Sequence, residues 1–285
     1  MMRSAIIAAM LLLLAGCTPA APKPAPAGPP PSADLISLSP AITETVALLG
    51  AESRLKGRSD WCNEPASVRA LAAFGTSLTP ALERIASANP ARLLIDGSLG
   101  NQRDQLEALA PVEVLPWLTV EEVMESTRRI GRLVDRGEAA EQLAERFRPW
   151  LRPLPAQTHA VLLLIGDDGP ETGTFWFVKE GSLHGAMLRA AGWRNAVAEP
   201  VATPSLSAEA LLRLDPEAIV VLVAKPDSDA DRSRLQEAFA RFDGLRAIRA
   251  HRLALLADPN ILSTGPSLLS TEAKLAALLK PWEAP

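Results

Sequence analysis

The sequence predicts an α/β protein with two lobes joined by a helical connector. Three observations lead to this prediction. Short apolar runs alternate with amphipathic segments, a long charged helical segment at 119–154 interrupts the alternation, and one helix–strand unit occurs twice. Strands that alternate with helices in this way are typical of parallel βαβ units. We therefore expect an N-terminal α/β lobe at 35–118 and a C-terminal α/β lobe at 155–285.

The first lobe begins with a short apolar strand, Leu35 to Leu38, followed by Ser39 and Pro40. Serine is favoured at a helix N-cap and proline at the first helical position, so a helix is expected to begin here. Apolar residues then recur at helical spacing until Gly50, which predicts the end of this helix. The other elements expected in this lobe are strands at 54–57, 93–95 and 112–115, and helices from about residue 80 and at 102–109.

The connector at 119–154 has the pattern of surface helices. Apolar residues such as Val123 and Ile130 recur at helical spacing with charged residues between them. We expect Gly137 to divide the segment into two helices and Pro149 to end or kink the second, because proline cannot donate the interior hydrogen bond. The alternation of strands and helices resumes with the apolar strand Val161 to Ile165.

One helix–strand unit occurs in both predicted lobes. The segments LERIASANPARLLID (82–96) and AEALLRLDPEAIVVL (208–222) align without a gap. Each copy has the pattern of a helix, a turn marked by proline and a buried strand. The repeat predicts two lobes of similar construction; the alternative is a chance likeness between two generic helix–strand units.

The N-terminus predicts export and a lipid anchor. Arg3 precedes an apolar run, Ala5 to Leu14, which is shorter than the roughly 20 residues of a transmembrane helix and has the length of a signal-peptide core. The following LLAGC at 13–17 resembles a lipoprotein signal, which implies that 1–17 is a signal peptide and that Cys17 is lipidated. The alternative is an ordinary signal peptide in which Cys17 is incidental. We expect an extracytoplasmic protein held at a membrane.

Composition limits the partners and cofactors. Residues 18–34 are rich in proline and alanine, which favours an extended tether. The formal net charge of −4, with no basic patch, makes nucleic acid an unexpected partner. Cys62 is the only other cysteine, so no intrachain disulfide is expected once Cys17 is acylated. The chain has three histidines and no tyrosine, which excludes heme ligation by tyrosine and leaves histidine ligation open; no resident cofactor or metal site is predicted.

Several of these segments together resemble a known family. Residues 35–68, 82–96 and 206–222 are similar to the binding proteins of iron–siderophore and cobalamin ABC importers, above all in Ser37–Pro40 and the loop Trp61–Pro65. The resemblance implies two Rossmann-like lobes joined by a rigid backbone helix near 138–151, with a ligand cleft between them. It also implies a monomer that delivers a small ligand to a membrane permease and is not an enzyme. The ligand implied is cobalamin or a related corrinoid, with a ferric siderophore or heme as the alternative.

The predicted ligand residues lie mostly in loops at the carboxyl ends of strands, where parallel α/β sheets bind ligands. Trp61 is the main candidate, because an indole presents a large flat surface and the resemblance implies corrin contact at this position. The alternative is that Trp61 packs on its own lobe. Asp258 matches a ligand-contacting acid of the family, or else it caps a turn with Pro259. The ligand residues predicted in this way are Asp60, Trp61, Cys62, Phe74, Trp117, Trp176, Asp258 and Asn260.

Two more of these predictions carry a competing interpretation, and two further positions depart from the family pattern. Cys62 has the character of a small buried residue as much as that of a ligand contact. Trp176 lies in the apolar patch Phe175–Phe177, which also fits a strand crossing the second lobe. Ser77 and Thr203 stand where the cobalamin-binding pattern has aromatic residues, so the identity of the ligand is left open.

Two glutamates are predicted to dock the permease. The resemblance implies that one acid on each lobe, Glu83 and Glu209, pairs with arginines of the permease. Equivalent positions in the two repeats favour this role, and such charges would mainly orient docking. The alternative is that both glutamates only stabilise the first turn of a helix through its dipole.

Two other functions remain as alternatives. A ferric siderophore often requires cleft arginines, and Arg58 and Arg103 are the candidates. A secreted α/β enzyme is the alternative from another class, but the chain contains no Gly-x-Ser-x-Gly elbow and no phosphate-binding glycine loop. The acidic segment GDDGPETG at 166–173 suggests metal or sugar chemistry, or a solvated turn.

Overall fold

The computed structural model describes residues 34–97, 102–155, 158–198 and 201–282. The predicted signal peptide with Cys17 and nearly all of the predicted tether lie outside these residues. No helix in the described ranges is both long and apolar enough to cross a membrane.

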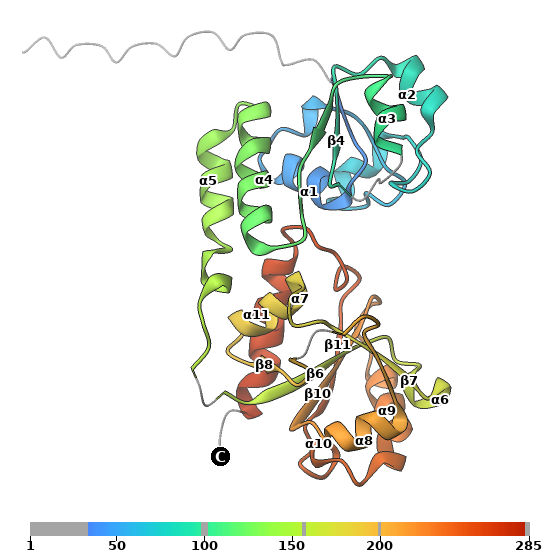
Figure 1. Ribbon diagram of the computed structural model, residues 1–285, viewed down its shortest axis with the longest axis vertical. Coiled ribbons are helices and arrows are strands. Elements are labelled where there is room, and N and C mark those ends of the chain that lie inside the picture. Colours follow the sequence, from blue (N-terminus) through green and yellow to red (C-terminus); the bar gives the residue numbers. More distant parts are fainter. Residues whose placement is uncertain (1–33, 98–101, 156–157, 199–200, 283–285) are drawn as a thin grey trace, which may run out of the picture. The chain divides into compact units, whose positions relative to one another are not determined.

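The first half of the described chain forms a parallel sheet (Figure 1). Its strands follow the order β3-β2-β1-β4-β5, and every neighbouring pair is parallel. A parallel sheet requires a crossover after each strand, and the apolar runs with intervening amphipathic segments supply it. The predicted α/β class is confirmed here. The strands are β1 (Leu35–Ser37), β2 (Leu55–Arg58), β3 (Ala72–Ala73), β4 (Arg92–Ile95) and β5 (Val112–Val114).

The helices of this half are α1 (Pro40–Leu48), α2 (Leu82–Ala88) and α3 (Arg103–Glu107). Pro40 stands at the start of α1, as predicted, and Ser39 has the extended backbone of an N-cap. The Ser39 hydroxyl, however, makes no capping bond; it is buried and has no hydrogen-bond partner among the described residues. The position of the helix therefore follows from local sequence preference, whereas the side-chain contact does not.

Two antiparallel helices, which connect the halves in chain order, lie side by side next to α1 (Figure 1). They are α4 (Val120–Leu133) and α5 (Gly137–Glu145), and a capping box between Thr119 and Glu122 begins α4. Asp135, with φ of 56°, lies in the break between them. The predicted division into two helices is confirmed, and α5 ends before Pro149. The backbone helix expected near 138–151 is thus α5 followed by a 3₁₀ turn at Arg148–Leu151.

The second half forms a mixed sheet in the order β11-β10-β6-β7-β9, and β8 also pairs with β6. The central strands β6, β10 and β11 are parallel, whereas β7 is antiparallel to both of its neighbours. The strand that the apolar patch around Trp176 allows is therefore present. These strands are β6 (Ala160–Ile165), β7 (Thr174–Phe177), β8 (Arg194–Asn195), β9 (Ser205–Ser207), β10 (Ala218–Val223) and β11 (Leu253–Ala257).

Helices cover both faces of the second sheet (Figure 1). One face packs on α7 (Leu183–Ala190) and α11 (Leu268–Leu279), and the other packs on α8 (Ala208–Leu214), α9 (Asp229–Phe239) and α10 (Arg246–Arg249). Both faces of β6 and β10 are buried, which explains why these strands are continuous apolar runs rather than alternating ones. A short helix, α6 (Gly169–Thr172), follows β6.

The internal repeat has the same conformation in both halves. The helices α2 and α8 each contain 7 residues and end at a left-handed residue, Asn89 with φ of 45° and Asp215 with φ of 42°. Asn and Asp tolerate this conformation better than other non-glycine residues. A proline follows each cap, and then β4 or β10 begins. The two copies thus have the same local structure in the two halves of the chain.

One apolar cluster contains residues from both halves and from the connector. Ile42 and Val46 of α1, Ile130 of α4, Leu163 of β6 and Leu275 of α11 all belong to it and are fully buried. Packing of this kind resists the relative displacement of its members, because separated surfaces lose both contact and burial.

We expect Gly131→Ala to lower the free energy of unfolding by about 1–3 kcal/mol, the range for an overpacked contact. A Cβ at 131 would lie 2.2 Å from the Cβ of Ala140, so α4 and α5 would have to separate. Alanine in a helix interior otherwise stabilises, so the clash reverses the usual sign. Denaturant unfolding is the measurement. Gly137→Ala is the matched control, since a Cβ there meets nothing within 4 Å, and equal losses in both variants would contradict the explanation.

Candidate ligand-binding site

The loop after β2 presents two of the predicted ligand residues and buries a third. Cys62 is fully buried, and its sulfur lies 3.1 Å from both Thr43 Oγ1 and Ser59 Oγ. This anchor holds the loop on α1 and leaves Asp60 and Trp61 exposed; half of the Trp61 surface, 50%, is accessible. The core of the lobe encloses the thiol, as expected for a structural cysteine, and ligand contact at Cys62 stays a prediction.

Phe74 lies in the core of the first half, and its role as a ligand contact stays a prediction. Its ring is buried with Ile36 and Ile85, and it packs so closely on Gly57 that a Cβ there would lie 2.1 Å from the ring. The guanidinium carbon of Arg84 lies 5.4 Å from the ring centroid. The loop that follows turns at Gly75, whose φ of 84° and close approach to a backbone oxygen require glycine.

Exposed apolar side chains gather in the loops at the carboxyl ends of the strands. Trp61 follows β2, and Trp176, with 47% of its surface exposed, pairs with Ile165 at the end of β6. Parallel α/β sheets bind ligands at this edge, so exposed apolar side chains beside strand ends are candidates for ligand contact. Of the exposed large apolar residues in the described chain, those beside strand ends are Trp61, Leu78, Leu118, Trp176 and Leu262.

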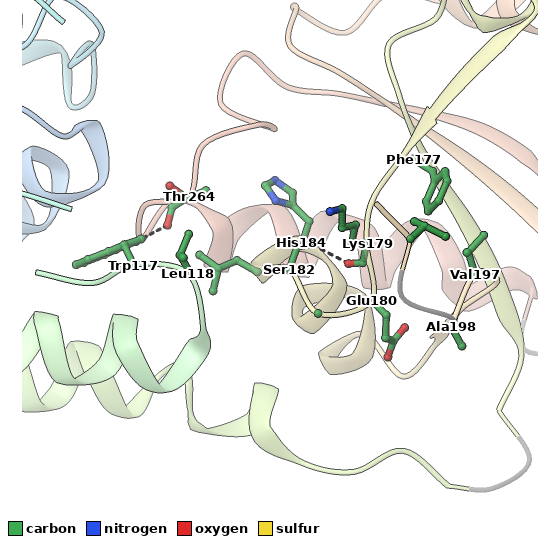
Figure 2. Close-up of a pocket in the computed structure, with 13 residues that line it drawn as sticks. Trp117, Leu118, Phe177, Lys179, Glu180, Ser182, His184, Val197, Ala198 and Thr264 are labelled. Carbon is green, nitrogen blue, oxygen red and sulfur yellow. Dashed lines mark hydrogen bonds between the residues drawn. The ribbon is translucent and has the colours of Figure 1, made fainter. Parts of the chain in front are cut away.

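A pocket with a volume of about 620 Å³ lies among the described residues (Figure 2). Trp117 and Leu118, which follow the last strand of the first sheet, line one part of it, and the end of β7, the segments after β7 and β8, and Thr264 line the rest. Of the predicted ligand residues, it contains Trp117 alone. The indole Nε1 of Trp117 donates a hydrogen bond to the carbonyl oxygen of Thr264 over 2.7 Å, so the ring is fixed as well as buried. The other lining residues are Phe177, Lys179, Glu180, Gly181, Ser182, Leu183, His184, Val197, Ala198, Val201 and Thr264.

Three ionisable side chains line this pocket. His184 donates from Nε2 to the carbonyl oxygen of Ile261 over 2.8 Å, and burial lowers the pKa of its imidazole. The imidazole is therefore neutral at pH 7, and its donor role at Nε2 fixes the tautomer. Glu180 lies 3.5 Å from Arg189, whereas Lys179 forms no ion pair with a described residue. Among the described residues, the lining of the pocket is therefore apolar apart from neutral His184, the paired Glu180 and the Lys179 ammonium.

The comparison with known families decides the class of the protein. The family model for periplasmic binding proteins matches residues 35–259, most of the chain. The chain belongs to the periplasmic binding protein family. Its members are extracytoplasmic substrate-binding proteins that serve ABC permeases, which agrees with the two-lobed α/β fold.

Individual relatives of this periplasmic binding protein differ in the ligand that their names give. The vitamin B12-binding protein of Pectobacterium carotovorum subsp. carotovorum (strain PC1) is 27% identical over 196 residues, 66% of this chain and 70% of that protein. The periplasmic heme-binding protein from Pseudomonas aeruginosa is 26% identical, with a TM-score of 0.69 over 87% of this chain and 93% of that one.

A third relative supports the fold alone. The periplasmic vitamin B12-binding protein of Vibrio cholerae has a TM-score of 0.71 over 90% of this chain and 100% of that one, at 18% identity. Taken together, the relatives establish the family and leave the ligand to be argued from the site.

Asp258 makes the contacts of a turn residue. Its Oδ1 accepts the backbone N–H of Asn260 over 2.8 Å, and its Oδ2 pairs with Lys274 of α11. Burial alone would raise the pKa of Asp258, but the Lys274 ammonium and the Asn260 amide outweigh it and hold that pKa below its usual value. Asp258 therefore stays ionised at neutral pH and fixes the start of the segment 258–267. Asn260 is half-buried, and neither residue lines the pocket.

The two predicted docking glutamates occupy equivalent and exposed places. Glu83 and Glu209 are the second residues of α2 and α8, and Glu209 lies 3.7 Å from Arg213 one turn later. An exposed pair at this spacing contributes only about 0.3–0.5 kcal/mol, so it would not prevent Glu209 from exchanging partners.

Metal chemistry finds no support in the described ranges. They contain no group of three or more His, Cys, Asp or Glu side chains able to hold a metal ion. In the acidic segment after β6, Asp167 pairs with Lys225 over 2.6 Å, which lowers the pKa of Asp167, and Asp168 precedes α6. This segment is a charged turn that begins a helix.

Proposed function

We propose that this periplasmic binding protein is the substrate-binding lipoprotein of an ABC importer and that it binds cobalamin or a related corrinoid. The observation that carries the proposal is the pair of half-exposed tryptophans, Trp61 and Trp176, at strand ends of the two sheets. An indole offers a wide flat contact at low entropic cost, which suits a large ring ligand. The 27% identical relative named vitamin B12-binding protein supports the same ligand class.

The cationic groups of the site disfavour a ferric siderophore. Arg58 donates to the carbonyl oxygens of Ser59 and Arg69 over 2.8 and 3.2 Å, so it braces its own loop. Arg103 pairs with Glu107 over 2.7 Å. An anionic chelate would have to replace these contacts, whereas a corrinoid needs no such pair of arginines.

Heme is the second candidate, because one relative at 26% identity is named for it. The chain has no tyrosine to ligate its iron. Two of its three histidines are engaged, His184 with the Ile261 carbonyl and His159 with Glu217 at 2.9 Å. Iron ligation would have to use the other ring nitrogen of His159 or His184, or else His251, which lies in an exposed turn. Of these three histidines, only His184 lines the pocket.

Attachment and delivery complete the proposal. Lipidation of Cys17 would hold the protein at a membrane, and the proline-rich 18–34 would separate the folded part from the surface. The protein would act as a monomer. Glu83 and Glu209 would then pair with permease arginines, one from each half, and orient the complex.

Cyanocobalamin is expected to quench the tryptophan fluorescence of the purified chain at micromolar concentration or below, because indoles would lie against the corrin ring. Trp61→Ala and Trp176→Ala should each weaken binding by about 1–3 kcal/mol, the range for an aromatic anchor. Titration by fluorescence, repeated with calorimetry for the variants, is the measurement.

Leu48→Ala is the matched control for these variants, because Leu48 is as exposed as the tryptophans but ends α1 away from the strand ends. Its affinity should equal that of the wild type. Saturable quenching by a ferric siderophore or by hemin, with no response to cyanocobalamin, would refute the corrinoid assignment.

The double variant Glu83→Ala with Glu209→Ala is expected to bind ligand normally and to abolish uptake, because both charges lie on exposed helix starts outside the pocket. Uptake of labelled ligand by cells that depend on this protein measures the effect. Glu121→Ala with Glu138→Ala, which changes first-turn glutamates of α4 and α5, should transport like the wild type. Normal transport by the first pair would show that docking uses other residues.

Cys17→Ser is expected to release the protein from the membrane fraction, since one cysteine would carry the whole anchor. Fractionation of cells followed by immunoblotting is the measurement. A variant that stays in the membrane fraction would exclude lipidation at Cys17 as the attachment.

A further inference from the structure

A buried carboxyl group links the two halves of the molecule. Glu44 lies on α1, and only 6% of its surface is exposed. Its oxygens accept hydrogen bonds from the backbone N–H of Ser267 over 2.6 Å and from the Ser267 hydroxyl over 3.3 Å. Ser267 directly precedes α11, and an N–H at a helix start has no acceptor within its own helix. Glu44 therefore caps a helix that belongs to the other half of the chain.

The contact is too close to be incidental. A Cβ on Gly265 would lie 2.0 Å from Glu44 Oε2 and 3.3 Å from the Cα of Ala41. Position 265 thus accepts only glycine while Glu44 is in place. The start of α11 and the side of α1 are fitted to each other at this point.

The same segment, 258–267, also contributes to the pocket. Trp117 donates to the Thr264 carbonyl and His184 donates to the Ile261 carbonyl, and Trp117, His184 and Thr264 all line the pocket (Figure 2). A change in the bonding of Glu44 to Ser267 would therefore affect the pocket wall, which begins three residues away at Thr264. Glu44 itself touches none of the predicted ligand contacts and acts through this segment.

Glu44 titrates near neutral pH. Burial raises its pKa to about 7, although the two bonds from Ser267 lower it, and the nearby Glu64 carboxylate raises it further. The other ionisable groups on the elements packed around this contact are bonded to partners other than Glu44. Asp258 pairs with Lys274, and His184 is bonded to the Ile261 carbonyl.

The sign of the pH effect follows from this shift. A neutral Glu44 keeps both contacts, with the carbonyl oxygen accepting from the Ser267 amide and the acid O–H donating to the Ser267 hydroxyl. An ionised Glu44 keeps two acceptors but leaves a charge in a desolvated place. The pKa of Glu44 in the folded chain, about 7, lies above the unfolded value of 4.5. The stability that neutral Glu44 gives to the contact is therefore fully present below about pH 4.5 and is lost as the pH rises through about 7.

We propose that Glu44 is a positioning residue whose neutral carboxyl group holds the segment 258–267 against α1 and whose ionised form loosens that hold. The contact between the two halves of the binding protein is then more stable at mildly acidic pH than at mildly alkaline pH. An extracytoplasmic protein is exposed to the pH outside the cytoplasm, so the stability of this contact would change with the external pH.

Hydrogen–deuterium exchange of the ligand-free full chain tests this proposal between pH 6 and 8.5. Each amide rate at 262–270 is divided by its intrinsic rate at the same pH. The protection of these amides in the wild type should fall as the pH rises through about 7. The expected fall between pH 6 and 8.5 is on the order of tenfold, which corresponds to the free energy of one pKa unit. Glu44→Gln, which mimics the neutral acid, should keep high protection throughout.

Glu272→Gln is the matched control, because Glu272 is an acid on the same helix, five residues beyond Ser267, whereas the Ser267 amide and hydroxyl bond to Glu44. This variant should retain the wild-type pH profile. Protection in the wild type that does not change with pH would overturn the proposal. A Glu44→Gln variant that keeps the wild-type slope, or a Glu272→Gln variant that loses it, would overturn the proposal as well.

A second arm rests on the proposed corrinoid function. Cyanocobalamin affinity should decline with rising pH in the wild type and stay constant in Glu44→Gln. The exchange experiment needs no ligand, so failure of cyanocobalamin to bind would count against the proposed function, while the exchange profiles would still decide the role of Glu44. If cyanocobalamin binds the wild type and Glu44→Gln with the same pH dependence, the proposed role of Glu44 is contradicted.

Discussion

The architecture depends on a single apolar cluster that both halves share. Residues of α1, α4, β6 and α11 are buried in it together, although they come from distant parts of the chain. Without this shared core, each sheet would be a separate small domain with a weaker interior. Because this core is shared, the two sheets and their strand-end loops form a single packed unit. The pocket beside Trp117 and the bond between Glu44 and Ser267 both lie along this unit.

The elements that follow from local pattern were predictable from the sequence. Pro40 marked the start of α1, Gly137 the second connector helix, and the repeat at 82–96 and 208–222 two equivalent units. Propensity and periodicity act over a few residues, so a single sequence contains them. Side-chain roles were less predictable. Cys62 and Phe74 lie in loops by position, but tertiary packing turns both toward the core.

The pocket and the contact between the halves could not be predicted in the same way. Trp117 and Thr264 are 147 positions apart in the chain, and Glu44 and Ser267 are 223 apart. No periodicity joins residues at such distances. Lys179 and His184 were likewise missed as pocket residues, because a lone lysine or histidine has no signal in its neighbours. The raised pKa of Glu44 also depends on burial, so it arises only when the surrounding chain is folded.

The placement of Cys62 has a practical consequence for spectroscopy. Among the described residues it is the sole cysteine, and it is enclosed completely. A maleimide dye or a nitroxide label needs an accessible thiolate, so it would leave this position untouched in the native fold. Cysteines introduced on the surface of each sheet would then be the sites that react within this part of the chain. Distances between the halves then become measurable with Cys62 left in place.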